Sequence, residues 1–318
     1  MENKRLLISQ SPHIRSTRTT QNVMLDVIIA LMPAVIAGSI IFGLRALLVV
    51  AVCAAASVGS EFLFNLVLKR KQTVGDFSAL VTGTLLGLNL HAVVPLWQCV
   101  IGAAFAIIVV KCMFGGLGCN FANPAITARV VLVIAFTSTV SGGVLPGTVD
   151  KIFFPSSEEL ITTATPLVDG FGSPTLFDLF IGNWGGAIGE TCALALMIGY
   201  AYLVIRKVIK FETPLVYVGS VFVFSLIATG SFYAALSQVL SGGLLLGAIF
   251  MATDYVTTPI TRSGRMIFAL GAGILTFLIR FFGSYPEGVS FAILFMNILS
   301  PYIEKWTKNR PLGAKGGK

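Results

Sequence analysis

The sequence VMLDVIIALMPAVIAGSIIFG, residues 23–43, decides the fold, and it continues directly into LRALLVVAVCAAASVGSEFLFNLVL, residues 44–68. Each stretch is long enough for a helix that crosses a bilayer, which needs about 20 mostly apolar residues. The charged side chains in the two stretches together are Asp26, Arg45 and Glu61. The sequence therefore predicts two consecutive transmembrane helices joined by a very short turn.

The composition extends this expectation to the rest of the chain. Hydrophobic residues make up 55% of the 318 residues, charged residues only 11%, and the mean hydropathy is +0.88, which leaves too few polar groups to cover a soluble protein. Further apolar runs follow at residues 77–89, 94–114, 124–140, 185–205, 214–229, 234–250, 266–282 and 289–302. We therefore expect an all-α membrane protein with about ten transmembrane helices.

A polar stretch rich in Pro and Gly, residues 141–183, separates the first five runs from the last five. Because an odd number of spans precedes it, the second half enters the membrane from the opposite side, and the halves are expected to be inverted five-helix repeats. A faint similarity between VTGTLL (81–86) and LSGGLL (240–245) favours such a repeat. The predicted parts are a cytoplasmic segment 1–22, a first repeat 23–140, an outer loop 141–183, a second repeat 184–304 and a basic cytoplasmic tail 305–318.

The Lys and Arg residues give the predicted orientation. With the N-terminus in the cytoplasm, nineteen of the 22 lie on or near the inner side, and only Arg45, Lys151 and Arg280 lie outside. This is the asymmetry of the positive-inside rule, so both termini are expected in the cytoplasm and residues 141–183 on the outer side. The formal charge of +8 therefore needs no nucleic-acid partner. The polar start extends to Asn22, so the first run is expected to be a retained span.

The hairpin GGLGCNFANPA, residues 115–125, joins the fourth and fifth runs and has two interpretations. In one, it is a tight turn in which Asn123 caps a helix that begins at Pro124. In the other, its glycines let the backbone approach a planar or phosphorylated ligand at membrane depth. On the second interpretation, the candidate lining groups chosen for their polarity are Thr84, Gly115, Gly116, Asn120 and Asn123.

Acidic residues within apolar runs are candidates for ion coupling, because ionisable groups are costly inside a membrane and tend to mark ion paths. The three candidates are Asp26, Glu61 and Glu190. Asp26 and Glu190 are near enough to span ends to reach interfacial water instead. Glu61 lies deeper, although an ion pair with the basic cluster at residues 69–71 competes with ion binding. The five cysteines include no Cys-x-x-Cys, and no metal site is expected.

Four patches together resemble a known family. They are SPHIRS (11–16) leading into MLDVIIALMPA (24–34), the hairpin 115–125, TATPL (163–167) and YPEGVSFA (285–292). In this order they resemble the RnfD/NqrB family of membrane subunits, found in the Rnf electron-transport complex and in the sodium-pumping NADH:quinone reductase. The patches span almost the whole chain, so the resemblance is specific although each patch alone is weak.

The resemblance implies a cofactor and its site. In the family, a Ser/Thr-Gly-Ala-Thr motif carries FMN, which is joined through its phosphate to the threonine oxygen. The similar stretch here is TTAT (162–165), which implies Thr165 as the attachment residue, flanked by Ala164 and Pro166. Thr163 stands where the family usually has Gly. A second, non-covalent flavin such as riboflavin is also compatible with the resemblance.

The implied function is that of a flavin-carrying subunit of an ion-pumping ferredoxin:NAD oxidoreductase in the cytoplasmic (inner) membrane of a bacterium or archaeon. The moved ion is Na⁺ or H⁺. Because the chain lacks cysteine sets that bind iron–sulfur clusters, it holds no complete active site alone, and the implied partners are iron–sulfur subunits and a second covalent-flavin subunit. Two other functions stay open from the residues: a stand-alone channel or secondary transporter without redox cofactor, and an assembly scaffold.

Overall fold

The computed structural model describes residues 18–141, 144, 175–283 and 288–308, and its regular elements there are all helical. The first half contains α1 (Thr20–Phe42), α2 (Leu44–Val67), η1 (Val74–Asp76), α3 (Ser78–Leu88), α4 (Leu96–Ala104) with the π-helical η2 (Phe105–Cys112), α5 (Pro124–Ala135) and α6 (Thr137–Val140). The second half contains α7 (Leu176–Ile181), α8 (Ala193–Ile205), α9 (Glu212–Thr229), α10 (Phe232–Leu240), α11 (Leu244–Leu246) with the π-helical η4 (Gly247–Met251), α12 (Arg262–Phe282) and α13 (Val289–Trp306).

Every apolar run that the sequence shows contains a helix. Among the described residues, α1, α2, α9 and α12 are long and apolar enough to cross a bilayer, and α10 with α11 and η4 adds a fifth candidate that is bent by 63°. The apolar helices α3, α4 with η2, α5 and α8 are shorter. The prediction of an all-α, multi-pass membrane protein is confirmed, although several helices are too short to cross the membrane alone.

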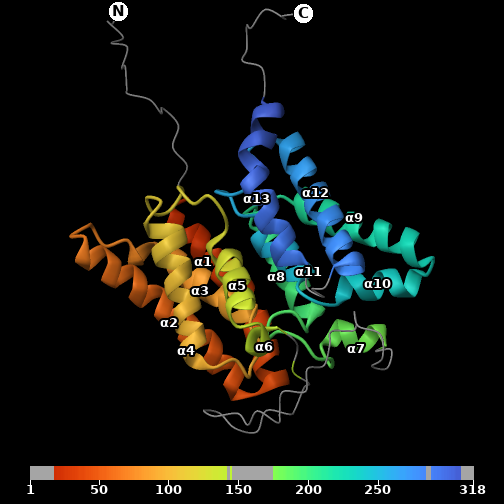
Figure 1. The fold of residues 1–318 in the computed structure, drawn as a ribbon, viewed down its shortest axis with the longest axis horizontal. Coiled ribbons are helices and arrows are strands. Elements are labelled where there is room, and N and C mark those ends of the chain that lie inside the picture. Colours follow the sequence, from red (N-terminus) through yellow and green to blue (C-terminus); the bar gives the residue numbers. More distant parts are fainter. Residues whose placement is uncertain (1–17, 142–143, 145–174, 284–287, 309–318) are drawn as a thin grey trace, which may run out of the picture.

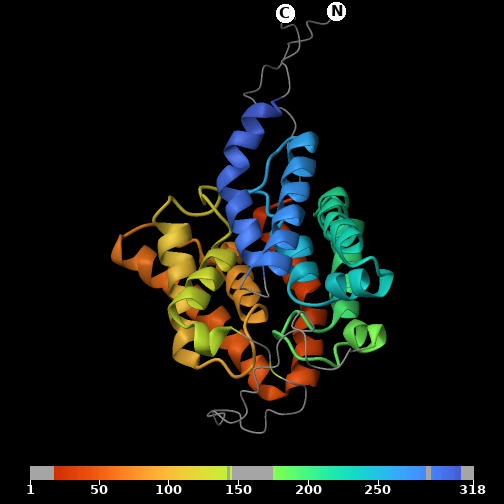
Figure 2. The ribbon, with the colours of Figure 1, turned by 45° about the vertical axis from the view of Figure 1, so that its right-hand side comes forward.

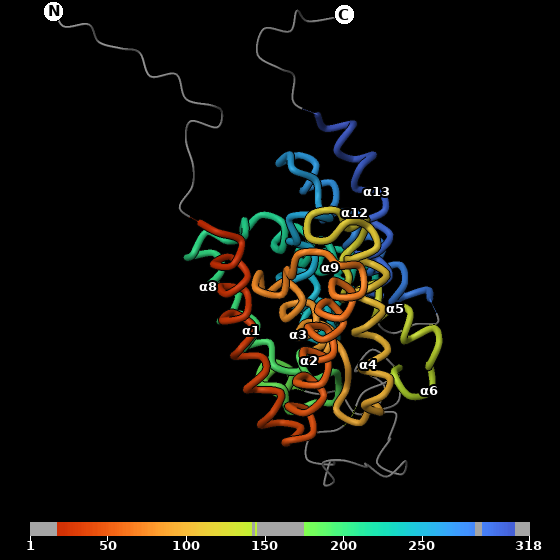
Figure 3. The backbone as a smooth tube through the Cα atoms, turned by 90° about the vertical axis from the view of Figure 1, so that its left-hand side faces the viewer, coloured from red at the N-terminus to blue at the C-terminus, as the bar shows by residue number. Residues whose placement is uncertain are grey.

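The two halves share one packing pattern. In the first half α2 packs on α3 and α4, and in the second half α9 packs on α10 and α12. Corresponding helices also meet between the halves, since α1 packs on α8 and α5 packs on α13; Figure 3 shows α1 and α8 side by side. The start of α1 and the end of α13 lie on the same side of the molecule, the upper side in Figures 1 and 2. We call this the inner side, because the charge distribution predicts it to be cytoplasmic.

The sixth run differs from its prediction. The apolar run begins at residue 185, but helix α8 begins only at Ala193. In between, the backbone N–H groups of Ile188 and Gly189 donate to the carbonyls of Leu90 and Leu88, at 2.9 and 2.8 Å. A Cβ at Gly189 would lie 2.6 Å from the Leu88 Cβ, so this approach requires glycine. The segment is therefore held in a non-helical form by contacts with the first half.

The eighth run is broken. Helix α10 ends at Leu240, and α11 begins at Leu244 after a turn in which Gly242 has φ +65°. A Cβ at Gly243 would lie 2.5 Å from Glu190 Oε1, so the break occurs where the segment before α8 meets the second half. The stretch 81–86 lies inside α3, whereas the similar stretch 240–245 contains this break. The faint sequence similarity therefore does not mark the same local structure.

Two arginines expected on the outer side donate hydrogen bonds to backbone carbonyls within the protein. Arg45 is buried and donates from Nε to the carbonyl of Ala92 at 3.0 Å and from Nη2 to that of Val94 at 2.9 Å. Arg280 donates to the carbonyls of Gln238 and Ser241, at 2.6 and 3.1 Å. Both guanidinium groups thus satisfy carbonyls next to helix breaks, where a membrane supplies no water.

Candidate functional site

A cavity of about 440 Å³ lies on the inner side, between the two halves. Its volume is within the range of small-molecule sites, roughly 300–1,000 Å³. The apolar part of its wall includes Met24 and Val27 of α1, Val81 and Leu85 of α3, Leu203 of α8 and Phe250 of η4. The polar part includes Arg18, Ser78, Thr82, Lys111, Asn120, Asn123 and Asp254. A largely apolar cavity with a few convergent polar groups is typical of a site for a small molecule or cofactor.

The hairpin 115–125 forms one end of this cavity through Leu117, Gly118, Asn120, Asn123 and Pro124. Asn123 caps α5, since its Oδ1 accepts from the backbone N–H groups of Ala125 and Ile126 at 3.0 and 3.4 Å. The capping interpretation is therefore confirmed for Asn123, and the same residue also borders the cavity. The Asn120 Oδ1 atom is buried and has no hydrogen-bond partner among the described residues, so it is free to bind a ligand group.

The other predicted lining groups lie elsewhere. Gly115 and Gly116 end the preceding helix, where the Gly116 N–H donates to the carbonyl of Lys111 at 2.9 Å. Their φ angles of +120° and +96° explain why glycine occupies both positions. The Thr84 hydroxyl donates to the Leu80 carbonyl at 2.8 Å within α3. None of these three residues lines the cavity described above.

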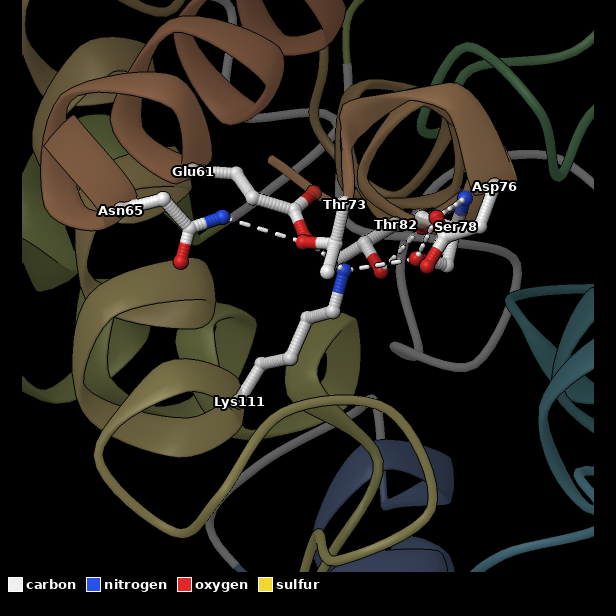
Figure 4. A network of polar contacts seen from close by, with 7 residues as sticks. All are labelled: Glu61, Asn65, Thr73, Asp76, Ser78, Thr82 and Lys111. Carbon is white, nitrogen blue, oxygen red and sulfur yellow. Dashed lines mark hydrogen bonds and ion pairs between the residues drawn. The ribbon is translucent and has the colours of Figure 1, made fainter. Parts of the chain in front are cut away.

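Glu61 is part of a buried polar network (Figure 4). Its Oε1 lies 2.8 Å from Lys111 Nζ and accepts from the Thr73 hydroxyl at 2.6 Å. Glu61 is 1% exposed and Lys111 is 2% exposed. The Glu61 Oε2 atom is buried without a partner among the described residues. The competing interpretation, an ion pair with residues 69–71, is wrong, because the partner comes from η2 and not from the local cluster.

The same network connects Glu61 to the wall of the cavity. Lys111 Nζ also donates to the Ser78 hydroxyl at 2.6 Å, and Ser78 in turn donates to Asp76 Oδ1 at 2.5 Å. The Asn65 amide donates to the Thr73 hydroxyl at 3.0 Å. Lys111 and Ser78 both line the cavity, so the Glu61 carboxylate is in direct contact with a residue of the cavity wall.

The other two acidic candidates are also paired. Asp26 Oδ1 lies 3.1 Å from Arg206 Nη2 and accepts from the Tyr202 hydroxyl at 3.0 Å, which joins α1 to α8. Glu190 is 3% exposed, and its Oε1 lies 2.9 Å from Arg129 Nη1 of α5. The expectation that Glu190 reaches interfacial water is therefore wrong. Glu190 Oε2 has no partner among the described residues.

Asp254 lies at the cavity wall in the turn between η4 and α12. Its Oδ1 accepts from the Val256 N–H at 3.4 Å and its Oδ2 from the Thr257 hydroxyl at 3.2 Å. Burial raises the pKa of this carboxyl above its ordinary value. The residue thus stabilises the turn and also brings an acidic group to the cavity.

The expected flavin-attachment stretch, Thr163, Ala164, Thr165 and Pro166, lies outside the described residues. Among the described residues, Lys111, Ser78 and Arg129 belong to the buried polar contacts of the candidate site but are not among the residues predicted from the sequence. From the sequence, Lys111 is taken only as a basic residue on the inner side. A single Lys inside the apolar run 94–114 nevertheless indicates a functional or structural role, because a charge within a membrane span is costly without one.

Comparisons with known proteins agree with the resemblance found in the sequence. The family model described as NQR2, RnfD, RnfE family matches residues 7–313. The D subunit of the Na⁺-translocating ferredoxin:NAD⁺ oxidoreductase complex of Acetobacterium woodii is 42% identical, over 98% of this chain and 97% of the relative. The D subunit of the proton-translocating ferredoxin:NAD⁺ oxidoreductase complex of Clostridium ljungdahlii is 37% identical, over 97% of this chain and 96% of the relative.

A third relative, the D subunit of the ion-translocating oxidoreductase complex of Marinobacter nauticus, is 36% identical over 97% of this chain and 95% of the relative. Both the family model and the relatives therefore cover nearly the full chain, including both halves and the hairpin that borders the cavity. The chain belongs to the NQR2, RnfD, RnfE family.

Proposed function

We propose that this chain is the membrane-embedded, flavin-carrying subunit of an ion-pumping ferredoxin:NAD oxidoreductase. The observation that carries the proposal is its 42% identity, over 98% of its length, to the D subunit of a complex named for this activity. The relatives' names favour this function over a stand-alone channel or a scaffold, because each is named as one subunit of an oxidoreductase complex. Its partners are then the other subunits of that complex, including iron–sulfur subunits and a second covalent-flavin subunit.

Covalent FMN at Thr165 is the first part of the proposal. It rests on the resemblance of residues 162–165 to the attachment motif of the family. The described residues on either side of this stretch, α6 and α7, lie on the side opposite the start of α1 and the end of α13 (Figure 1). The basic residues indicate that both termini lie in the cytoplasm, so the attached flavin is on the outer side of the membrane. The membrane is then the cytoplasmic membrane of a bacterium or archaeon.

A second, non-covalent flavin such as riboflavin in the inner cavity is the next part. The fit rests on the cavity volume of about 440 Å³, its apolar walls and the unpartnered Asn120 Oδ1. Met24, Val27 and Phe250 would hold the ring, and Asn120, Asn123 and Lys111 would bind its polar edges. When bound, a flavin accepts and passes on one or two electrons, while the protein supplies its position and tunes its potential.

Ion coupling is the last part, and Glu61 is its best candidate. All three acidic candidates are paired with a cation: Asp26 and Glu190 with guanidinium groups at 3.1 and 2.9 Å, and Glu61 with Lys111 at 2.8 Å. What distinguishes the Glu61 pair is that it reaches the cavity, because Lys111 lines it whereas Arg129 and Arg206 do not. A carboxylate linked in this way to a redox site could exchange Na⁺ or H⁺, the two ions for which relatives are named.

The test of the covalent flavin uses the denatured full-length chain. We expect in-gel fluorescence under ultraviolet light and an intact mass raised by one FMN less one water. Thr165→Ala should abolish both signals, whereas Thr163→Ala, two residues away, should retain them. A colourless wild-type chain of unmodified mass would contradict the proposal.

A further inference from the structure

The two π-helical segments of the described chain border the same cavity. Segment η2 contributes Lys111, and segment η4 contributes Ile249 and Phe250. A π-helical turn costs hydrogen-bond geometry and is frequent at functional sites, because it redirects side chains from their regular helical positions. Here it brings a lysine that is 2% exposed to the wall of an otherwise largely apolar cavity.

The ammonium group of Lys111 can only donate hydrogen bonds. A lysine ammonium has three N–H donors and no acceptor. Among the described residues, two of these donors are used by Glu61 Oε1 at 2.8 Å and Ser78 Oγ at 2.6 Å. Lys111 lines the cavity, and its third donor has no partner among the described residues.

Ser78 cannot supply a donor in its place. Its hydroxyl proton is directed to the Asp76 carboxylate, at 2.5 Å, while its oxygen accepts from Lys111. The Thr73 hydroxyl likewise donates to Glu61 at 2.6 Å. At this part of the wall the network offers the Lys111 N–H donor, while the carboxylates of Glu61 and Asp76 do not line the cavity; Asp254 lines it from a different segment, the turn between η4 and α12. Such a wall favours an acceptor atom, and favours it more when the atom carries negative charge.

We infer that Lys111 donates a hydrogen bond to the acceptor edge of a planar redox ring in the cavity and stabilises the negative charge that this ring gains on reduction. The inference rests on the proposed non-covalent flavin. When bound, an oxidised flavin ring that took up two electrons, supplied by reduced ferredoxin through the complex, and one proton from water would carry one negative charge. Glu61 and Ser78 are the positioning residues that hold the Lys111 side chain in place.

Removing the two partners of the ion pair should have opposite effects. Lys111→Met keeps an apolar stem of similar length but removes the positive charge, so reduction becomes less favourable. Glu61→Gln leaves the Lys111 charge uncompensated, so reduction becomes more favourable. We expect at least a tenfold change in the ratio of affinities for the reduced and oxidised ring in each case, which is about 30 mV for a two-electron couple. A purely structural ion pair would instead lose ligand in both variants.

The experiment uses the full-length chain in detergent, in a Thr165→Ala background, so that added riboflavin is the only flavin present. Riboflavin binding is followed by fluorescence quenching, and the midpoint potential of the bound riboflavin by a spectroscopic redox titration. Lys69→Met is the matched control: Lys69 is exposed and does not line the cavity, so this variant should leave the potential unchanged. The double variant Glu61→Gln/Lys111→Met avoids an unpaired buried carboxylate, and its potential should be lower than that of Glu61→Gln.

The outcomes separate this inference from the proposed function. Opposite shifts in the two single variants support it. If riboflavin binds but its potential is the same in the Thr165→Ala parent, Lys111→Met and the double variant, the inference fails and the proposed flavin site stands. If the Thr165→Ala parent binds no riboflavin, the inference and the proposed non-covalent flavin site fail together.

Discussion

The ion pair between Arg129 and Glu190 should contribute far more to stability than a surface pair of the same length. The two side chains are 6% and 2% exposed, and their closest atoms are 2.9 Å apart. Arg129 Nη1 also donates to Asn89 Oδ1 at 2.7 Å and to the Asn89 carbonyl. Arg129→Met would leave the buried Glu190 carboxylate without its cation. Breaking such a pair by removing one partner typically costs about 3–5 kcal/mol.

The chain contains a matched control for this prediction. Arg262 and Glu212 form a pair at 2.8 Å, but the Arg262 side chain is 71% exposed. Solvent screening reduces an exposed pair to less than about 1 kcal/mol, so Arg262→Met should have a small effect. The free energy of unfolding of both variants can be measured by SDS titration in detergent micelles, followed by far-ultraviolet circular dichroism.

The charge-neutral double variant Arg129→Met/Glu190→Gln tests the cause. If the cost arises from an uncompensated buried charge, the double variant should be more stable than Arg129→Met, since it removes that charge. Equal losses of stability in Arg129→Met and Arg262→Met would refute the reasoning. So would a double variant that is less stable than Arg129→Met.

Two further predictions concern ion coupling and the packing of the two halves. Glu61→Gln should lower redox-driven ion uptake by vesicles that contain the complex, while Glu212→Gln, at an exposed ion pair, should leave the uptake unchanged. Normal uptake in Glu61→Gln would show that Glu61 is not needed for ion coupling. Gly199→Ala should destabilise the chain by about 1–3 kcal/mol, because the new Cβ would meet the Ala30 carbonyl of α1 and lie 3.0 Å from the Phe250 ring. Gly219→Ala, in α9 with nothing within 4 Å of the added atom, should instead stabilise the chain by about 0.5–1 kcal/mol. If both variants changed the free energy of unfolding in the same direction relative to wild type, the comparison would be contradicted.

The sequence predicts most of the helices because their signal is local. Long apolar runs such as 23–43 and 44–68 have few alternatives in a membrane, and they appear as α1 and α2. Asn123 is predictable as a cap because the Asn-Pro pair is a helix-start signal in itself, and its side chain does cap α5.

Features that depend on tertiary contact are not predictable in this way. The run from residue 185 is apolar enough for a helix, but the backbone before Ala193 bonds to Leu88 and Leu90 of the first half instead. The partner of Glu61 is Lys111, 50 positions away, so the nearer basic cluster is the natural but wrong choice. The cavity likewise forms only where α1, α3, η2 and η4 meet, and no single stretch of sequence contains it.

The most direct test of the proposed function is ion uptake driven by electron transfer. Inverted vesicles that contain the complete complex would be supplied with reduced ferredoxin and NAD⁺, and Na⁺ and H⁺ uptake would be measured together with NADH formation. We predict that wild-type vesicles form NADH and take up one of the two ions, and that Thr165→Ala in this chain stops both, while Thr163→Ala does not. Full NADH formation and ion uptake in the Thr165→Ala vesicles would contradict the proposed role of Thr165.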